Sequence, residues 1–152
     1  NLNMQTAIVG IGCFWVESKF KDLKGVISTE VGYCGGTTSE TNYEMVCRGQ
    51  CDSAEVIKIN FNDKILDYKD LLRFVFSSHD PTTLDRQGPD VGRQYRSEIF
   101  FMNDNQKRDA EKIRKEIDEK LNGKVVTKIS KVSNYKKAEE YHQKYYQKKG
   151  ML

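Results

Sequence analysis

The order of two hydrophobic periodicities along the chain constrains its fold more than any other feature of the sequence. Apolar residues alternate every second position in some segments and recur at helical spacing in others. The predicted order is strand, helix, strand, strand, helix, strand, over residues 6–10, 14–23, 26–33, 54–61, 68–76 and 99–102. This β-α-β-β-α-β order is the split, ferredoxin-like arrangement, which predicts an α+β two-layer sandwich with helices backing a mixed sheet.

The remaining third of the chain predicts additional C-terminal elements. Asn103 is expected to cap a long charged helix that carries an apolar stripe and ends at Gly123. A final strand over residues 127–132 and a short helix over residues 139–148 are expected to follow. A length of 152 residues fits one domain, so we expect a single catalytic domain spanning residues 1–152.

Composition excludes several classes of protein. Hydrophobic residues make up 38% of the chain and charged residues 31%, the balance of an ordinary globular protein. No apolar run approaches the roughly 18 residues of a membrane span, and no secretory signal is evident, so a cytoplasmic location without membrane contact is expected. The net charge is +3, and acidic residues interrupt the basic C-terminal stretch, which is typical of a solvated helix face and not of nucleic-acid binding.

Two long segments of irregular composition, residues 34–52 and 79–96, are expected to form functional loops. In and beside them lie phenols and other polar groups that could bind a polar substrate oxygen. These are Tyr33, Tyr43, Asp85, Arg86, Gln87, Asp90, Gln94 and Tyr95. Tyr43 and Tyr95 could equally anchor their loops to the core.

One of the four cysteines, Cys13, stands at a predicted strand-to-helix junction directly after Gly12. Unpaired N–H groups and the helix dipole at a helix start favour the thiolate, so the pKa of such a thiol falls below its free value. A buried core cysteine is the alternative. The other three are Cys34, Cys47 and Cys51; no C-x-x-C pair or common zinc spacing is present, so no metal site is expected and all four are expected to be reduced.

Glu55 is a candidate acid. In the alternating segment 54–61 it shares a face with Ile57, Ile59 and Phe61. A carboxylate on an apolar face is desolvated, which raises its pKa toward neutrality and lets it donate a proton at pH 7. The alternative is an exposed charge at the end of a strand.

Histidine provides a competing hypothesis. His79 or His142 could act as a base for Cys13, which would make the protein a Cys–His hydrolase. His79 stands at a predicted helix end, where a histidine can instead cap carbonyl groups.

Eight stretches of the chain form a recognisable set of motifs. They are GCFW at 12–15, VGYCGG at 31–36, NYEMVCRG at 42–49, AEV at 54–56, HDPT at 79–82, DRQG at 85–88, DVGRQYRS at 90–97 and AEEYHQ at 138–143. They occur in order over nearly the whole chain, so together they are highly specific. With these motifs the chain resembles the type A peptide methionine sulfoxide reductases.

The resemblance implies thiol-dependent reduction of methionine S-sulfoxide, free or within oxidised proteins, to methionine. Cys13 corresponds to the nucleophile that becomes a sulfenic acid, and Glu55 to the acid that protonates the sulfoxide oxygen. Tyr43 and Tyr95 correspond to the phenols that hold this oxygen. Phe14 and Trp15 correspond to the pocket for the substrate methyl group, and Asp90 to a carboxylate that helps position the substrate.

Regeneration of the nucleophile remains open at this point. Many members of the family resolve the sulfenic acid with C-terminal cysteines, whereas this sequence has no cysteine after Cys51. The resemblance therefore implies no bound cofactor and an external thiol reductant, glutathione with glutaredoxin or thioredoxin. Cys51 or Cys34 as an internal resolving thiol is the alternative, and a redox or metal-binding module built on Cys34, Cys47 and Cys51 is a further one. Some family members carry selenocysteine at the position of Cys13.

Overall fold

The structure is a computed structural model, which describes residues 3–12, 17–36 and 52–139. Its main sheet has six strands in the order β7-β6-β1-β3-β2-β8, and β4 and β5 form a separate hairpin. The elements are β1 (Met4–Ile11), α1 (Ser18–Lys21), β2 (Val26–Cys34), β3 (Ala54–Asn62), α3 (Tyr68–Ser77), β4 (Arg86–Gln87), β5 (Asp90–Val91), the 3₁₀ helix η2 (Arg93–Tyr95), β6 (Ser97–Phe101), α4 (Asp104–Lys120), β7 (Lys128–Lys131) and β8 (Lys136–Lys137).

The central four strands confirm the predicted topology. β6, β1, β3 and β2 are neighbours in this order, and each adjacent pair is antiparallel, as the split β-α-β arrangement requires. The added strand β7 runs parallel to β6, which makes the sheet mixed. A parallel neighbour needs a crossover connection, and α4 provides it. The α+β fold with a mixed sheet and helices is therefore as predicted.

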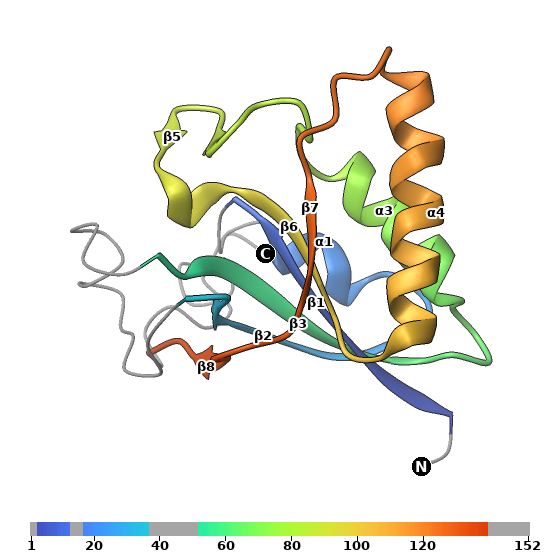
Figure 1. Cartoon of the computed structure of the whole chain (residues 1–152). Coiled ribbons are helices and arrows are strands. Elements are labelled where there is room, and N and C mark those ends of the chain that lie inside the picture. Colours follow the sequence, from blue (N-terminus) through green and yellow to red (C-terminus); the bar gives the residue numbers. More distant parts are fainter. Residues whose placement is uncertain (1–2, 13–16, 37–51, 140–152) are drawn as a thin grey trace.

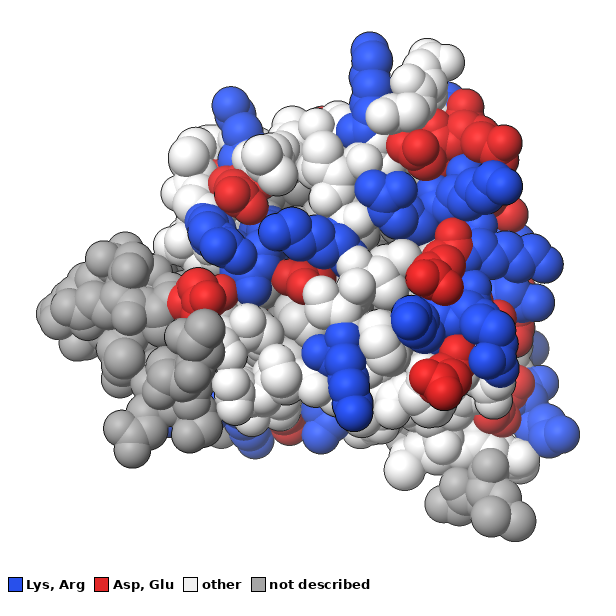
Figure 2. All heavy atoms as spheres, viewed as in Figure 1, with Lys and Arg blue, Asp and Glu red and all other residues white. Residues whose placement is uncertain are grey.

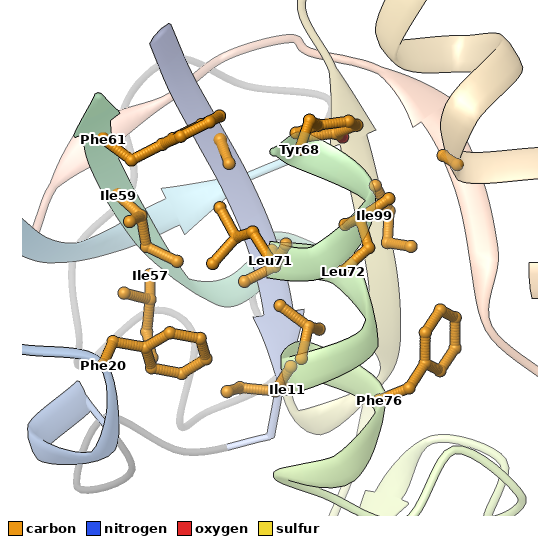
Figure 3. Close-up of a cluster of buried hydrophobic side chains, with 14 of the residues drawn as sticks. Ile11, Phe20, Ile57, Ile59, Phe61, Tyr68, Leu71, Leu72, Phe76 and Ile99 are labelled. Atoms are coloured by element: carbon orange, nitrogen blue, oxygen red, sulfur yellow. The ribbon is translucent and has the colours of Figure 1, made fainter. Parts of the chain in front are cut away.

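The main core lies between one face of the sheet and the helices (Figures 1 and 3). Alternate residues of β1 and β3, such as Val9, Ile57 and Ile59, pack against Leu71 and Leu72 of α3. Each large aliphatic side chain buried in this way stabilises the fold by about 1.5–3 kcal/mol before conformational entropy is counted. The predicted apolar face of α3 is thus the face that holds this helix on the sheet.

The opposite face of the sheet carries a smaller cluster. Ile8, Cys34, Ala54, Val56 and Phe100 form it, and the segment after β7 covers it with Val132 and Tyr135. Because successive residues of a strand point to opposite faces, Cys34 and its neighbour Tyr33 lie on different sides of the sheet.

Some elements differ from the sequence-based expectation. Residues 79–96 were expected to lack regular structure, but they contain the β4–β5 hairpin and η2. The edge strand β8 was not anticipated. The predicted cap of the long helix is confirmed, because the Asn103 side chain accepts a hydrogen bond from the Gln106 N–H at 2.9 Å. Beyond residue 139, the predicted terminal helix lies outside the described residues.

The described part of the chain contains no helix that is both long enough and apolar enough to span a bilayer. On the face shown in Figure 2, lysine and arginine side chains alternate with aspartate and glutamate. This mixture matches the composition of α4, in which acidic and basic residues follow one another along the helix.

Candidate active site

The most unusual side chain of the sheet is Glu55 in β3. It is only 4% exposed, and it pairs with Tyr33 of the neighbouring strand β2 on the face that carries the main core. Burial, and secondly the negative charge of Asp90, raise the pKa of Glu55 from 4.5 to about 8. At neutral pH this carboxyl group is therefore largely protonated, and it can donate a proton.

Strand β1 ends at the same end of the sheet at which β3 begins. The two strands are antiparallel, with Val9 opposite Ile57, so the last residues of β1 lie beside the first residues of β3. Gly12 follows with φ of 102°, a backbone conformation that favours glycine. The predicted nucleophile Cys13, and the predicted pocket residues Phe14 and Trp15, come directly after it but lie outside the described residues.

The β4–β5 hairpin brings two further polar residues to this end of the sheet. Asp90 of β5, whose charge acts on Glu55, pairs with Gln87 of β4. The side chain of Gln87 touches Gly12, because a Cβ atom on this glycine would lie 2.4 Å from the Gln87 Cβ. Asp90 and Glu55, which are 35 positions apart in the sequence, are thus close enough to interact electrostatically.

Of the two predicted oxygen-binding phenols, the structure describes one. Tyr95 is half-buried in η2, which packs against β3, the strand of Glu55. Its N–H donates to the carbonyl of Gly92 at 3.0 Å, closing the turn that joins the hairpin to β6. Tyr43 lies outside the described residues.

His79 has a structural role. Its Nδ1 lies 2.8 Å from the carbonyl of Val75, and its Nε2 lies 2.7 Å from the Ser97 hydroxyl. Burial lowers the pKa of His79 to about 4, so the ring is neutral at pH 7 and donates from Nδ1 to the last turn of α3. Both nitrogens are engaged in this way, which disfavours His79 as the base of a Cys–His hydrolase. His142 is not among the described residues.

Cys34 is the cysteine that the structure describes, and it points away from Glu55. It is fully buried in the cluster on the opposite face, where its thiol donates to the carbonyl of Ser133 at 3.2 Å. Burial raises the pKa of this thiol, so it is a poor nucleophile. The other two candidates, Cys47 and Cys51, lie outside the described residues.

Sequence reasoning missed a buried ion pair beside Cys34. The Arg96 Nε donates to Glu98 Oε1 at 2.7 Å, and both side chains are buried. Ser130 of β7 donates to the second carboxylate oxygen. A signal was present, because residues 96 and 98 are separated by two positions and so share a face when the strand is extended.

Within residues 3–12, 17–36 and 52–139, no group of three or more His, Cys, Asp or Glu side chains is arranged to hold a metal ion. At this end of the sheet, a protonated carboxyl group, a second carboxylate and a turn that carries a phenol instead lie near one another. Such a site can bind a polar oxygen and transfer a proton to it.

Comparisons with known proteins identify the family of this chain. The family described as peptide methionine sulfoxide reductase matches residues 5–151. Peptide methionine sulfoxide reductase MsrA of Pelagibacter ubique is 53% identical over 147 residues, which are 96% of this chain and 100% of the relative.

Solved structures agree with the sequence comparison. The reduced form of Mxr1 from Saccharomyces cerevisiae matches with a TM-score of 0.92 and 35% identity, covering 99% of this chain and 88% of the yeast chain. Mxr1 in complex with Trx2 matches with a TM-score of 0.67 and 26% identity, covering 93% and 85% of the two chains. The chain therefore belongs to the peptide methionine sulfoxide reductase family, and it reduces methionine sulfoxide.

Proposed function

We propose that Cys13 is the nucleophile of this reduction and that Glu55 is its acid. The observation that carries the proposal is the burial of Glu55, which holds a proton on this carboxyl at neutral pH. A sulfoxide sulfur becomes a good electrophile only when its oxygen gains a proton. A neutral acid beside a thiolate meets this need, because the two groups have pKa values that are moved in opposite directions.

The proposed step transfers oxygen from one sulfur to another. The Cys13 thiolate attacks the sulfoxide sulfur while Glu55 gives its proton to the oxygen. The attack forms a bond between the two sulfurs. The hydroxyl group then moves to the Cys13 sulfur as methionine's S–O bond and its bond to Cys13 break, so methionine leaves reduced by two electrons and Cys13, oxidised by two electrons, becomes the sulfenic acid. Glu55, now ionised, regains a proton from water. The negative charge of Asp90 raises the proton affinity of Glu55, and we assign to Asp90 the further role of helping to position the substrate.

The remaining roles follow from the family resemblance. Tyr95 and Tyr43 hold the sulfoxide oxygen, and Phe14 and Trp15 surround the methyl group. The position of η2 against the strand of Glu55 supports the role of Tyr95. Aromatic side chains bind a methyl group by burying apolar surface, which orients the sulfur and fixes the epimer that reacts. The preferred substrate is the S epimer, either free or within an oxidised protein.

An external thiol is the proposed reductant. A first thiol attacks the sulfenic acid, releasing water and leaving a mixed disulfide, and a second thiol then frees Cys13. A thioredoxin-type protein is supported by the complex of yeast Mxr1 with Trx2; glutathione with glutaredoxin is the other external route. Such reductants fit the expected cytoplasmic location. Cys51 remains the internal alternative, whereas the burial of Cys34 on the opposite face disfavours that residue.

One single-turnover experiment tests the proposal. The reduced protein is mixed with an equimolar amount of each epimer of methionine sulfoxide, methionine is quantified, and the modified cysteine is mapped by mass spectrometry. We expect one methionine per protein from the S epimer, with the modification on Cys13, and none from Cys13→Ser. Methionine release by Cys13→Ser, or a first modification on another cysteine, would overturn the assignment. A Cys13–Cys51 bridge would instead select the internal route of regeneration.

A further inference from the structure

The side chain of Gln87 packs against the turn before Cys13. Its Cβ and Cγ lie over Gly12, where an added Cβ atom would come within 2.4 Å and 2.5 Å of them. Gly12 itself is buried and has a positive φ. The aliphatic part of the Gln87 side chain therefore packs against the backbone of Gly12, which precedes the proposed nucleophile.

The amide end of the same side chain is held by the main chain of Asp80. Gln87 Oε1 accepts from the Asp80 N–H at 2.8 Å, and Gln87 Nε2 donates to the Asp80 carbonyl at 3.0 Å. Both ends of the amide are thus occupied by one residue, which fixes its orientation. Asp80 follows His79, which is anchored to α3 through Val75 and to β6 through Ser97. Gln87 is therefore tied to the rigid part of the fold.

The backbone of Gln87 completes the connection. Gln87 is paired with Asp90 across the β4–β5 hairpin, and Asp90 is the carboxylate that acts on Glu55. A single residue thus contacts the turn before Cys13, belongs to the hairpin that carries Asp90, and binds Asp80 in the loop that follows α3.

We propose that Gln87 is a positioning residue, which holds the turn before Cys13 and the Asp90 hairpin at the distances from Glu55 that the oxygen transfer needs. The inference rests on the proposed function, because it assigns chemistry to Cys13 and Glu55. Its action is indirect: Gln87 sets the geometry in which other groups react. Small displacements of such groups are costly, and a shift of about 1 Å can slow a reaction roughly a hundredfold.

Two substitutions separate the two parts of this contact. Gln87→Met keeps an unbranched stem over Gly12 but removes both hydrogen bonds to Asp80. Gln87→Ala removes the amide and most of the stem. Gln5→Ala is the matched control, because Gln5 lies at the other end of β1 and its amide also makes a side-chain hydrogen bond, to Asp63 at 2.8 Å.

The decisive measurement is the single-turnover rate of methionine formation at saturating S-sulfoxide, with the steady-state KM and the thermal midpoint recorded for each variant. We expect Gln87→Ala to slow the single-turnover rate by roughly ten- to a hundredfold, with Gln87→Met between it and the wild type. The midpoint should fall no further than in Gln5→Ala, which should keep the wild-type rate. Exchange of the Asp80 amide hydrogen should become faster in Gln87→Met, because its acceptor is gone.

Three results would overturn the inference. A wild-type single-turnover rate in both Gln87 variants would leave the side chain as a simple loop anchor. A higher KM with an unchanged rate at saturation would make Gln87 a substrate contact. An equal loss of rate in Gln5→Ala would make the effect one of general stability. Failure of the proposed function looks different, because Cys13→Ser would then release methionine whatever the Gln87 variants do.

Discussion

Two buried glutamates on opposite faces of the same sheet show how neighbours decide what a carboxyl group does. Glu55 of β3 and Glu98 of β6 are 4% and 6% exposed, and β1 lies between their strands. Glu98 is bound by Arg96 and Ser130. Glu55 instead lies near the negative charge of Asp90. It keeps its proton at neutral pH, which avoids the free-energy cost of burying a charged carboxylate. Equal burial thus produces a structural ion pair on one face and an acid on the other.

The largest expected effect comes from removing the acid. Glu55→Gln keeps the shape of the side chain but has no acidic proton, so we expect the single-turnover rate of methionine formation to fall by roughly 10²- to 10⁴-fold. The matched variant Glu98→Gln should retain the rate of the chemical step in whatever fraction remains folded. Equal rates in wild type and Glu55→Gln would remove the distinction between the two glutamates.

The same variant has a second, pH-dependent signature in stability. The folded protein holds the Glu55 proton up to a pKa of about 8, whereas the unfolded chain loses it near 4.5. The free energy of unfolding of the wild type should therefore fall relative to that of Glu55→Gln as pH rises from about 4.5 to about 8. Below this interval the difference between the two proteins should no longer change with pH. Urea denaturation of both proteins across the interval measures this slope. A flat difference would show that Glu55 ionises normally.

Breaking the ion pair should have its main effect on stability. Arg96→Met leaves the Glu98 carboxylate buried without its charged partner, which we expect to cost about 3–5 kcal/mol in the free energy of unfolding. The double variant Arg96→Met/Glu98→Leu removes both charges and should recover most of this loss. Chemical denaturation gives both free energies of unfolding. An unstable double variant would show that the ion pair stabilises the fold beyond compensating its own two buried charges.

A smaller effect is expected from Asp90→Asn. Removal of the negative charge lowers the pKa of Glu55, because a like charge no longer opposes its ionisation. The alkaline limb of the pH–rate profile reports loss of the Glu55 proton, so it should move to lower pH. Single-turnover rates of the two proteins over the same pH series test this direction, and a shift to higher pH would contradict it.

The smallest effect is expected from Cys34→Ser, on the face that carries the ion pair. A serine hydroxyl can also donate to the Ser133 carbonyl, so we expect a change of about 1 kcal/mol or less in stability. Because Cys34 points away from Glu55, turnover with an external thiol should be unchanged. A marked drop in multiple-turnover rate, with a normal first turnover, would restore Cys34 as a resolving thiol.

Sequence patterns indicated more about Glu55 itself than about the residues and strands around it. Burial of Glu55 could be proposed from the face that it shares with Ile57 and Ile59, although the spacing left an exposed charge at the strand end as the alternative. The effect of Asp90 on it could not, because it depends on a hairpin with two-residue strands that are too short to show a period. The same limit hid β8, whose two exposed lysines pair with β2 through the backbone and leave no hydrophobic trace.

The strand β2, whose Tyr33 pairs with Glu55, has one neighbour that is synthesised late, the strand β8. β8 pairs with Gly32 and Tyr33 of β2, and the Tyr33 hydroxyl donates to Glu139 at 3.4 Å, just beyond this strand. During synthesis on the ribosome, β1 through β6 emerge first, and β2 then forms an open sheet edge that can pair with another chain. Until β8 emerges and covers this edge, nascent copies would be most prone to aggregate through it.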